Sequence, residues 1–339
     1  MIRIEDAKKM LRRLGKCRVL VLGDLMLDRY VSGSVSRISP EAPVPVLRVQ
    51  EERGVPGGAA NVAKNIRALG GQAVLAGVVG LDAAGRELMA LLRTAGIQTT
   101  GVVPWRGCQT IVKTRVLADR HQLVRVDWED SMDQVQGAAK ELCRRIPALV
   151  RESDGVIIED YGKGVVSQAV VDTALAAAKK FKRPVGLDPK DTHKLSFEWL
   201  TLATPNYAEA CAAAGLQMTD MDDNPLKNTT LAGAASILQE KWQCRLMMIT
   251  LGPHGMYLME KNGKPKVIPT RAREVYDVCG AGDTVIAATL LALSAGVSYE
   301  QAALLANYAA GVVVGKVGTA TCTPDELIAC LEAEKAVLK

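Results

Sequence analysis

The stretch "DVCGAGDTVIAATLLALSAG", residues 277–296, sets two glycines and an aspartate directly in front of a strongly apolar run. The run predicts a buried helix, and because glycine inside a helix costs about 1 kcal/mol relative to alanine, we expect Gly280 and Gly282 just before its start. Asp283 then lies in the first turn. Exposed N–H groups and the helix dipole make such a start a site for an anion, most often a phosphate, whereas a lone aspartate there can also merely complement the dipole of a core helix.

The rest of the chain alternates short apolar runs, typical of buried strands, with helical patterns. The strand-like runs cover residues 17–24, 72–80, 154–160, 183–189 and 244–252. The helical patterns cover residues 59–69, 167–180, 298–314 and 324–337, and a further helix begins near Asp82. Continuous apolar strands separated by helices indicate an α/β fold with a mostly parallel sheet that is covered on both faces.

Two stretches, residues 44–54 and 109–130, break this rhythm because they carry strand signals without helices between them. We expect them to form a small separate sheet, the second stretch as a hairpin that turns near Asp119–His121. Alternation along the first strand of that hairpin puts Lys113 and Arg115 on the face opposite to its valines. The charged face either covers a ligand or is simply solvated.

Composition and charge are those of an ordinary soluble enzyme. Of the 339 residues, 48% are hydrophobic and 23% are charged, and the formal net charge is +5. So mild a basic excess predicts no nucleic-acid partner and suits small phosphorylated molecules. The sequence has no signal-peptide pattern and no apolar run long enough to span a bilayer, so we expect no membrane partner and a cytoplasmic location. The eight cysteines form no C-x-x-C pair, which predicts reduced thiols rather than disulfides or a zinc site.

Two common nucleotide-binding signatures are not met. The segment "GVVVGKV", residues 311–317, is one residue too short for a P-loop and lacks the hydroxyl residue after Lys316. The segment "GAGDTV" fails the dinucleotide pattern G-x-G-x-x-G because Val285 stands where the third small residue belongs. A phosphate site at Asp283 therefore needs partners of another kind.

A second pair of glycines, Gly57 and Gly58, precedes the helical pattern at residues 59–69, with Asn61 in its first turns. Paired glycines let a ligand approach the backbone closely, and an asparagine amide both donates to and accepts from sugar hydroxyls. Asp24 follows the first strand, at the edge where open α/β sheets bind ligands, and is an acceptor suited to vicinal hydroxyls. These residue types suit a sugar.

The segment "TPNYAEA" adds Asn206 and Glu209. Their spacing is that of a helix capping box, in which each side chain accepts a hydrogen bond from the other residue's backbone N–H. It also brings a carboxylate to the start of a helix, so the pattern alone leaves a structural and a ligand-binding role open.

The segments "GGAANVAKNIRALG", residues 57–70, and "DVCGAGD", residues 277–283, resemble the two signature motifs of the ribokinase-like carbohydrate kinases, also called the phosphofructokinase B family. The resemblance extends over essentially the whole chain. It implies one kinase domain, residues 1–339, with a ribokinase-like α/β fold. It also implies a small β-sheet lid built from strands at approximately 30–54 and 105–130.

Three further segments are similar to the subgroup of D-glycero-β-D-manno-heptose 7-phosphate kinases, namely residues 23–49, "EDYGKG" at 159–164 and "DPK" at 188–190. The resemblance implies ATP-dependent phosphorylation of the anomeric hydroxyl, giving heptose 1,7-bisphosphate for ADP-heptose and lipopolysaccharide core synthesis. The alternatives are a kinase of another sugar or sugar phosphate, such as ribose, fructose or a hexose phosphate, and a non-catalytic sugar-phosphate sensor with the same fold.

The same resemblance assigns roles to particular residues. It makes Asp283 the base on the attacking sugar hydroxyl, with an anion hole formed by Gly280, Ala281 and Gly282. It implies sugar binding by Asp24, Gly57, Gly58 and Asn61, and nucleotide binding by Thr250, Gly252, Gly255 and Asn307. It implies ATP and Mg²⁺ as cofactors, the ion being held largely through waters by Asn206 and Glu209. The candidates for the partner of the 7-phosphate are Arg115, Lys163 and Lys190, the last of which could instead contact the ATP phosphates.

Three further expectations follow from the resemblance. The lid sheet, if its outer face is apolar, favours a homodimer. The bifunctional relatives carry a nucleotidyltransferase domain with an H-x-G-H motif, which this sequence lacks, so we expect the kinase alone. Cys279 stands where the family usually has a small hydroxyl residue, and a thiol beside a helix start is either activated as a thiolate or buried and inert.

Overall fold

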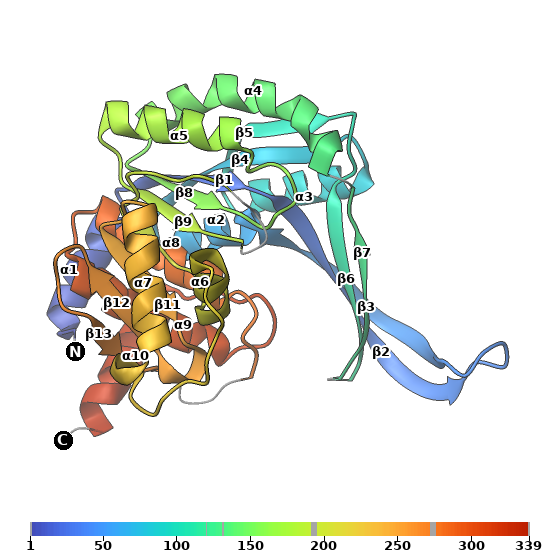
Figure 1. The fold of residues 1–339 in the computed structure, drawn as a ribbon. Coiled ribbons are helices and arrows are strands. Elements are labelled where there is room, and N and C mark those ends of the chain that lie inside the picture. The colour runs from blue at the N-terminus through green and yellow to red at the C-terminus, as the bar shows by residue number, and fades with distance from the viewer. Residues whose placement is uncertain (1, 120, 131, 191–194, 272–275, 338–339) are drawn as a thin grey trace.

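The structure is a computed structural model that describes residues 2–119, 121–130, 132–190, 195–271 and 276–337 (Figure 1). Its large sheet consists of β1 (Arg18–Gly23), β4 (Gln72–Gly80), β5 (Gln98–Trp105), β8 (Gly155–Glu159), β9 (Val185–Asp188), β10 (Leu202–Ala203), β11 (Leu246–Thr250), β12 (Met256–Glu260) and β13 (Lys266–Ile268). The strand order is β13-β12-β11-β10-β9-β8-β1-β4-β5. The pairs β11–β12 and β12–β13 are antiparallel and the other pairs are parallel, as the alternating pattern predicts.

Two layers of helices cover the large sheet (Figure 1). One layer contains α1 (Ile4–Leu14), α2 (Ala59–Ala68), α3 (Ala83–Thr94), α8 (Ala281–Ser294), α9 (Tyr299–Val314) and α10 (Pro324–Val337). The other contains α4 (Met132–Arg151), α5 (Gln168–Phe181), α6 (Tyr207–Ala214) and α7 (Thr229–Lys241). Two short 3₁₀ helices, η1 (Pro225–Lys227) and η2 (Gly252–His254), lie in the connections.

The strands of the large sheet are apolar on both faces because both faces are covered. In β1, Val19 and Val21 pack into the core on the α8 side, whereas Leu20 and Leu22 pack into the core on the α5 side. All five predicted strand-like runs contain a strand of this sheet, so that prediction is confirmed. The antiparallel edge strands β12 and β13 and the helix α4, which contains Pro147, were not predicted.

A small sheet projects from the large one (Figure 1). It consists of β2 (Leu25–Ile38), β3 (Pro45–Gly58), β6 (Ile111–Ala118) and β7 (His121–Trp128), in the order β3-β2-β6-β7. Both stretches that lack helices belong to it, and the β6–β7 hairpin turns at Asp119, which has a positive φ of 52°. The expected separate sheet is confirmed, although its central strand β2 begins five residues earlier than the approximate boundary at residue 30.

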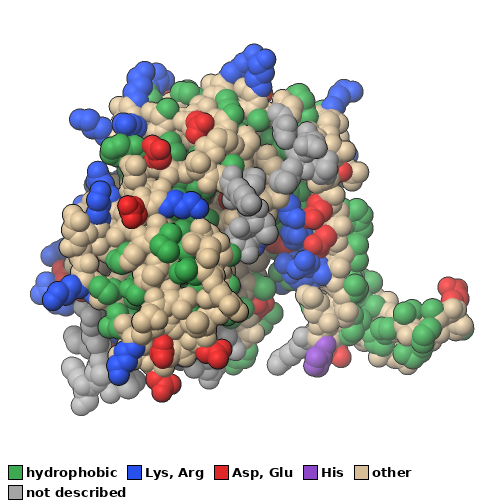
Figure 2. All heavy atoms as spheres, in the orientation of Figure 1, with side chains coloured by type: hydrophobic (Ala, Val, Ile, Leu, Met, Phe, Trp, Pro, Cys, Tyr) green, Lys and Arg blue, Asp and Glu red, His purple; other side chains and the backbone are tan. Residues whose placement is uncertain are grey.

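The two faces of the small sheet differ in chemistry. Lys113 and Arg115 lie on the face where they meet acidic partners, Asp127 and Asp28 respectively. The opposite face of β7 carries exposed apolar side chains, Val126 and Trp128 among them. Figure 2 shows hydrophobic side chains along the outer side of this sheet and clustered charged side chains between it and the large body.

The helix α8 begins at Ala281, after Gly280 with a positive φ of 77°. Gly282 is thus inside the first turn rather than before the helix, and Asp283 follows it as expected. The apolar run is buried from Asp283 to Ala292, which confirms the prediction of a core helix. No helix in the described ranges is long and apolar enough to cross a membrane.

Candidate active site

The carboxyl ends of the parallel strands meet beside the first turn of α8. β8 ends at Glu159, β9 ends at Asp188, β11 ends at Thr250, and Asp24 directly follows β1. Open α/β sheets bind ligands at this edge because the connecting loops and helix starts converge there. The acidic ends of β8 and β9 and the first turn of α8 form the floor of the candidate site.

Asp283 is fixed from two sides. Asn61 Nδ2 donates to its Oδ2 at 2.6 Å, and the Tyr161 hydroxyl donates to its Oδ1 at 2.9 Å. The side chain is buried, and burial raises its pKa, which the hydrogen bonds from Asn61 and Tyr161 partly oppose. A raised pKa brings a carboxylate nearer to the operating pH of a general base. Asn61 Oδ1 is buried next to it without a hydrogen-bond partner and is available to a substrate hydroxyl.

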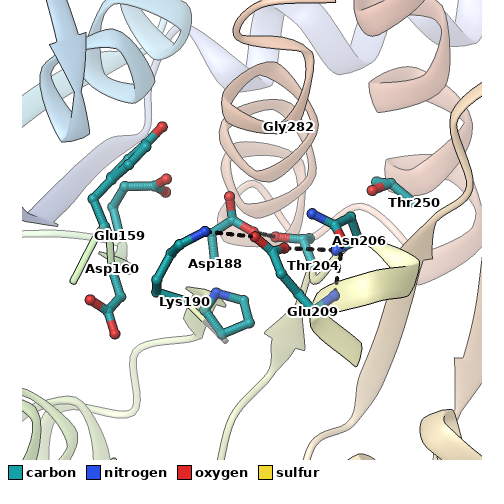
Figure 3. Close-up of a pocket in the computed structure, with 11 residues that line it drawn as sticks. Glu159, Asp160, Asp188, Lys190, Thr204, Asn206, Glu209, Thr250 and Gly282 are labelled. Atoms are coloured by element: carbon teal, nitrogen blue, oxygen red, sulfur yellow. Dashed lines mark hydrogen bonds and ion pairs between the residues drawn. The ribbon is translucent and has the colours of Figure 1, made fainter. Parts of the chain in front are cut away.

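Two carboxylates, those of Glu159 and Asp188 in Figure 3, lie next to Asp283. One oxygen each of Glu159, Asp188 and Asp283 lie within 4.8 Å of one another. Burial, followed by the charges of neighbouring carboxylates, raises the pKa of Glu159 and of Asp188 well above their usual range. Glu159 Oε2 is buried without a partner. Because uncompensated buried carboxylates are costly and hard cations prefer oxygen ligands, these residues fit a divalent ion such as Mg²⁺.

Asn206 and Glu209 serve as the capping box of α6. Asn206 accepts from the Glu209 backbone N–H at 2.9 Å, and Glu209 Oε2 accepts from the Asn206 backbone N–H at 3.0 Å. Both also line a cavity of about 150 Å³ together with Glu159, Asp188 and Lys190. Glu209 Oε1 lies 3.7 Å from Lys190 Nζ (Figure 3), so its second oxygen remains on the cavity side of the cap. The structural and the ligand-binding interpretations are therefore compatible.

A second cavity of about 590 Å³ lies on the other side of the α8 start. All four residues expected at the nucleotide line it, namely Thr250, Gly252, Gly255 and Asn307. Val285, Ala310 and Val314 supply apolar walls, which suit a flat heteroaromatic ring. Thr250 and Gly282 line both this cavity and the acidic one, so the first turn of α8 separates the two.

The expected anion hole fits this position. Gly280 needs its left-handed backbone, and a Cβ there would lie 2.8 Å from Asn61 Nδ2. A Cβ at Gly282 would meet only Asp188 Oδ2, at 3.9 Å, so that no described protein atom demands a glycine at this position. Ala281 and Gly282 both lie at the cavity. The Ala281 N–H already donates to the Val278 carbonyl at 3.2 Å, so of these two N–H groups that of Gly282 is the one that can face a phosphate.

Three of the residues expected to bind sugar, Asp24, Gly57 and Gly58, contact other parts of the protein instead of facing an open ligand site. Asp24 is fully buried, and its carboxylate accepts hydrogen bonds from the backbone N–H groups of Tyr161, Lys163 and Val165 at 3.0–3.1 Å. It therefore holds the loop that presents Tyr161 to Asp283, rather than offering free oxygens to hydroxyls. That loop carries the Tyr161 and Lys163 of the "EDYGKG" segment.

Gly57 and Gly58 are packed against protein rather than open to a ligand. A Cβ at Gly57 would lie 2.3 Å from Asp28 Oδ2, and one at Gly58 would lie 2.6 Å from the Asp24 carbonyl oxygen. Their absence of side chains lets β2 and β3 cross closely at the start of α2.

Several residues of the site were missed from the sequence. Asp28, only 4% exposed, pairs with Arg115 Nη1 at 2.6 Å and lies two residues before Tyr30 on the same face of β2. Tyr161 and the pair Glu159 and Asp188 were also missed. The available signal was an acidic residue at the end of each apolar run, which in a parallel sheet puts the carboxylates at one edge.

The three cations expected at the 7-phosphate do not form one group. Arg115 pairs with Asp28, Lys163 Nζ lies 2.7 Å from Glu129 Oε2, and Lys190 lies in the acidic cavity beside Glu209. Each thus has a carboxylate neighbour. For Lys190 the location favours the alternative role at the ATP phosphates.

Cys279 does not have the activated thiol that its place before α8 suggested. It is half-buried, and burial together with a hydrogen bond to Asp277 raises its pKa to about 11. Desolvation disfavours the thiolate more than the start of the helix favours it. The structure therefore favours the alternative of an inert thiol over an activated thiolate.

The sequence profile of the pfkB family carbohydrate kinases matches residues 16–326. The chain belongs to this family. It is a sugar kinase with two cavities, one on each side of the first turn of α8. The bifunctional protein HldE of Caulobacter sp. (strain K31) is 43% identical over 328 residues, which cover 97% of this chain and 65% of that protein. The bifunctional protein HldE of Shewanella sp. (strain ANA-3) is 44% identical, over 93% of this chain and 64% of that protein, so the chain spans less than two thirds of the length of these relatives.

Solved structures share the fold. Arabidopsis thaliana ribokinase complexed with ribose and ATP superposes with a TM-score of 0.70 at 20% identity, over 94% of this chain and 99% of that chain. Escherichia coli phosphofructokinase-2 in complex with potassium superposes with a TM-score of 0.73 at 20% identity and the same coverage. This pfkB kinase therefore has the ribokinase-like α/β fold, as expected.

Proposed function

We propose that this kinase transfers the γ-phosphoryl group of ATP to the anomeric hydroxyl of D-glycero-β-D-manno-heptose 7-phosphate, giving heptose 1,7-bisphosphate and ADP, in the cytoplasm. The observation that carries the reaction type is the buried Asp283 at the partition between an acidic cavity and a larger one. The choice of sugar rests on the similarity of residues 23–49, 159–164 and 188–190 to heptose 7-phosphate kinases.

In the proposed mechanism Asp283 takes the proton of the sugar hydroxyl as that oxygen attacks the γ-phosphorus. The bond from the γ-phosphorus to the bridging oxygen breaks, and ADP leaves with the electron pair. Asn61 and Tyr161 hold the carboxylate in position, at 2.6 and 2.9 Å. The backbone N–H of Gly282 faces the charge that develops on the transferred group, whereas that of Ala281 donates to the Val278 carbonyl. Preorganised donors of this kind stabilise the transition state of phosphoryl transfer.

A divalent ion would be held by Glu159, Asp188 and, across the capping box, Glu209, whose carboxylates face one cavity. When bound, the ion supplies positive charge to the phosphates of ATP. Magnesium keeps much of its hydration shell, which suits ligands such as Asn206 and Glu209 that already take part in a helix cap. Lys190, which lines the same cavity, adds a cation at the phosphates.

The small sheet is proposed to act as a lid over the sugar and, through its outer face, as the contact with a second copy of the chain. Val124, Val126 and Trp128 are 49%, 39% and 47% exposed on β7, which is a large apolar area for a monomer to leave in water. Obligate homodimer interfaces are apolar in the same way. Sedimentation of the wild type beside Val126→Glu tests this, because a charge in the contact should shift the species toward the monomer.

The function is tested by ADP production with MgATP and a panel of sugars: the β- and α-anomers of heptose 7-phosphate, ribose and fructose 6-phosphate. We expect the highest kcat/KM with the β-heptose phosphate. A higher kcat/KM with another sugar of the panel would change the assigned substrate but would still identify a sugar kinase. ADP release that does not depend on any sugar would favour the sensor instead.

A further inference from the structure

Two cations near the proposed sugar site differ from the three that the sequence singled out. Arg53 lies on β3 and Lys64 lies on α2, and within the described ranges neither has a carboxylate oxygen within 4.0 Å. Among the described residues, Lys64 Nζ donates to the backbone carbonyl of Thr319, at 3.1 Å, and to no other polar acceptor. Arg115, Lys163 and Lys190 each have a carboxylate neighbour, so Arg53 and Lys64 are the cations whose charge remains available to an anion.

The small sheet holds Arg53 in an ordered row. Tyr30 on the central strand pairs directly with Arg53 on β3 and with Arg115 on β6, so the three side chains share one face. The guanidinium carbons of Arg53 and Arg115 lie 5.1 and 5.4 Å from the centre of the Tyr30 ring. Stacking of this kind orients the guanidinium groups without using their N–H donors.

The Tyr30 hydroxyl lies at the same place. The residue is 7% exposed, and its buried hydroxyl interacts with the Thr319 side chain but forms no hydrogen bond of normal geometry. That hydroxyl is 3.9 Å, and Arg53 Nη2 is 3.6 Å, from the position that a Cβ would take on Gly318. A buried hydroxyl without a well-formed hydrogen bond is rare, and a ligand oxygen would supply that bond.

The row lies within a short distance of the reacting carboxylate. A Cβ on Gly280 would be 3.9 Å both from Asp283 Oδ2 and from Thr319 Cγ2. Thr319 is also the residue whose carbonyl accepts from Lys64. The contacts therefore run from Asp283 through Gly280 and Thr319 to Lys64, and from the adjoining Gly318 to Arg53. Burial and the charge of Arg53 lower the pKa of Lys64, the direction expected for two cations that share a space lacking an anion.

We propose that Arg53, Lys64 and the Tyr30 hydroxyl bind the phosphate ester that the sugar substrate already carries, at the end opposite to the hydroxyl that is phosphorylated. The inference rests on the proposed function and names the determinant of its preference for a phosphorylated sugar. Arg115 already forms an ion pair with Asp28, and Lys190 lines the acidic cavity, where it would contact the ATP phosphates. Charge-assisted bonds from two cations to a phosphate dianion give this end of the substrate most of its polar binding.

The test compares each phosphorylated sugar with the same sugar lacking the phosphate: heptose 7-phosphate with heptose, fructose 6-phosphate with fructose, and ribose 5-phosphate with ribose. The variants are Arg53→Ala, Lys64→Met and Tyr30→Phe. Arg48→Ala, which removes an exposed arginine from the same strand β3, is the matched control. Thermal unfolding and the KM for MgATP are measured for every variant, so that loss of the fold is recognised.

We expect Arg53→Ala and Lys64→Met each to lower kcat/KM for the phosphorylated sugar by about 10- to 100-fold, the range of a charge-assisted bond, mainly through KM. Tyr30→Phe should lower it by a few-fold, since it removes only a neutral hydroxyl. The values for the unphosphorylated sugar and for MgATP should stay within about twofold, and Arg48→Ala should resemble the wild type.

The outcomes separate this inference from the proposed function. If the wild type prefers a phosphorylated sugar other than heptose 7-phosphate and Arg53→Ala abolishes that preference, the substrate is wrong and the phosphate site stands. If the wild type uses heptose 7-phosphate best and Arg53→Ala and Lys64→Met keep its KM, the function stands and the site is overturned. Equal losses for both members of a pair, or a wild type indifferent to the phosphate, also overturn the site.

Discussion

The helices α2 and α8 begin with similar backbone geometry, but their first turns contribute different groups to the site. Each follows a glycine with positive φ, Gly58 at 58° and Gly280 at 77°, and neither has a side-chain cap. Their first turns meet where Asn61 donates to Asp283. The first turn of α2 contributes a neutral amide, and that of α8 contributes a buried carboxylate between two cavities.

The glycines at the two starts have different physical causes. At α2 an added methyl group would collide with protein atoms 2.3 and 2.6 Å away, so packing explains Gly57 and Gly58. At α8 an added methyl group on Gly282 would meet only Asp188, at 3.9 Å, so the protein itself leaves that space open. The same sequence pattern thus marks a crossing of strands in one place and, in the other, the space for a ligand.

The largest loss of activity is expected from substitutions of Asp283 and Asn61, which are hydrogen-bonded to each other. Asp283→Asn is nearly isosteric and should keep the fold and ATP binding, while kcat falls by about 10²-fold or more because the base is lost. Asn61→Ala should reduce kcat less, since Tyr161 still holds the other oxygen of Asp283. Steady-state kinetics with nucleotide binding measured separately checks this. An Asp283→Asn enzyme that keeps more than about a third of its turnover would remove the aspartate from the chemistry.

Replacing Gly282 and Gly58 by alanine compares a glycine beside the proposed ligand with one that packing requires. Gly282→Ala should leave the melting temperature unchanged or slightly higher, because alanine gains up to about 1 kcal/mol in a helix, yet lower kcat/KM for ATP by about tenfold through contact with the phosphates. Gly58→Ala should lower the melting temperature, since alanine at positive φ costs about 1–2 kcal/mol before any collision with the Asp24 carbonyl. Calorimetry and ATP kinetics on both variants separate the two causes. Full ATP affinity in Gly282→Ala would mean that nothing occupies that space.

A smaller effect concerns the carboxylate that both caps α6 and lines the acidic cavity. Glu209→Gln keeps a side-chain acceptor for the Asn206 N–H, so the cap and the melting temperature should be preserved. The Mg²⁺ concentration at half-maximal rate should rise severalfold, because an ion ligand or its water-holding neighbour has lost its charge. A magnesium titration at saturating ATP measures this. Unchanged magnesium dependence with a lowered melting temperature would leave the residue as a cap alone.

The smallest effect is expected at Cys279, two residues before the start of α8. Its pKa is raised to about 11 by burial and by Asp277, so the thiolate that reacts with iodoacetamide is scarce at neutral pH. Labelling should be slow at pH 7 and should rise by about tenfold for each pH unit up to about pH 10. Mass-spectrometric mapping of the label over this pH range is the measurement. Rapid labelling at pH 7 that MgATP prevents would instead support an activated thiolate at Cys279.

Much of the scaffold could be predicted because it follows from local pattern. Apolar runs of seven to nine residues predicted parallel strands, and the run after Asp283 predicted the buried helix. The small sheet was recognisable from strand signals without helices. The local pattern did not show the long strand β2, and the resemblance to the family put the start of the lid near residue 30. The reason is that "LMLDRYVSGSVSRI" passes from the core into solvent and shows no single period along its length.

The partners of the site residues could not be predicted, because they are set by packing between distant segments. Asn61 and Asp283 are 222 residues apart in the chain, and their contact depends on how α2 and α8 cross. Asp24 looks from the sequence like a ligand for hydroxyls, but the fold turns its oxygens toward three backbone N–H groups of a loop more than 130 residues away. Which carboxylate is free, and which is already used, is a property of the tertiary structure.

In the proposed function, Asp283 directs phosphoryl transfer to the anomeric hydroxyl of a sugar that already carries a phosphate. The most direct measurement is ³¹P NMR of the reaction of β-heptose 7-phosphate with MgATP, for the wild type and for Asp283→Asn. We expect a new anomeric phosphate signal beside the unchanged 7-phosphate, formed one for one with ADP, and almost none from the variant. Transfer to another hydroxyl, or an equal signal from Asp283→Asn, would contradict the account.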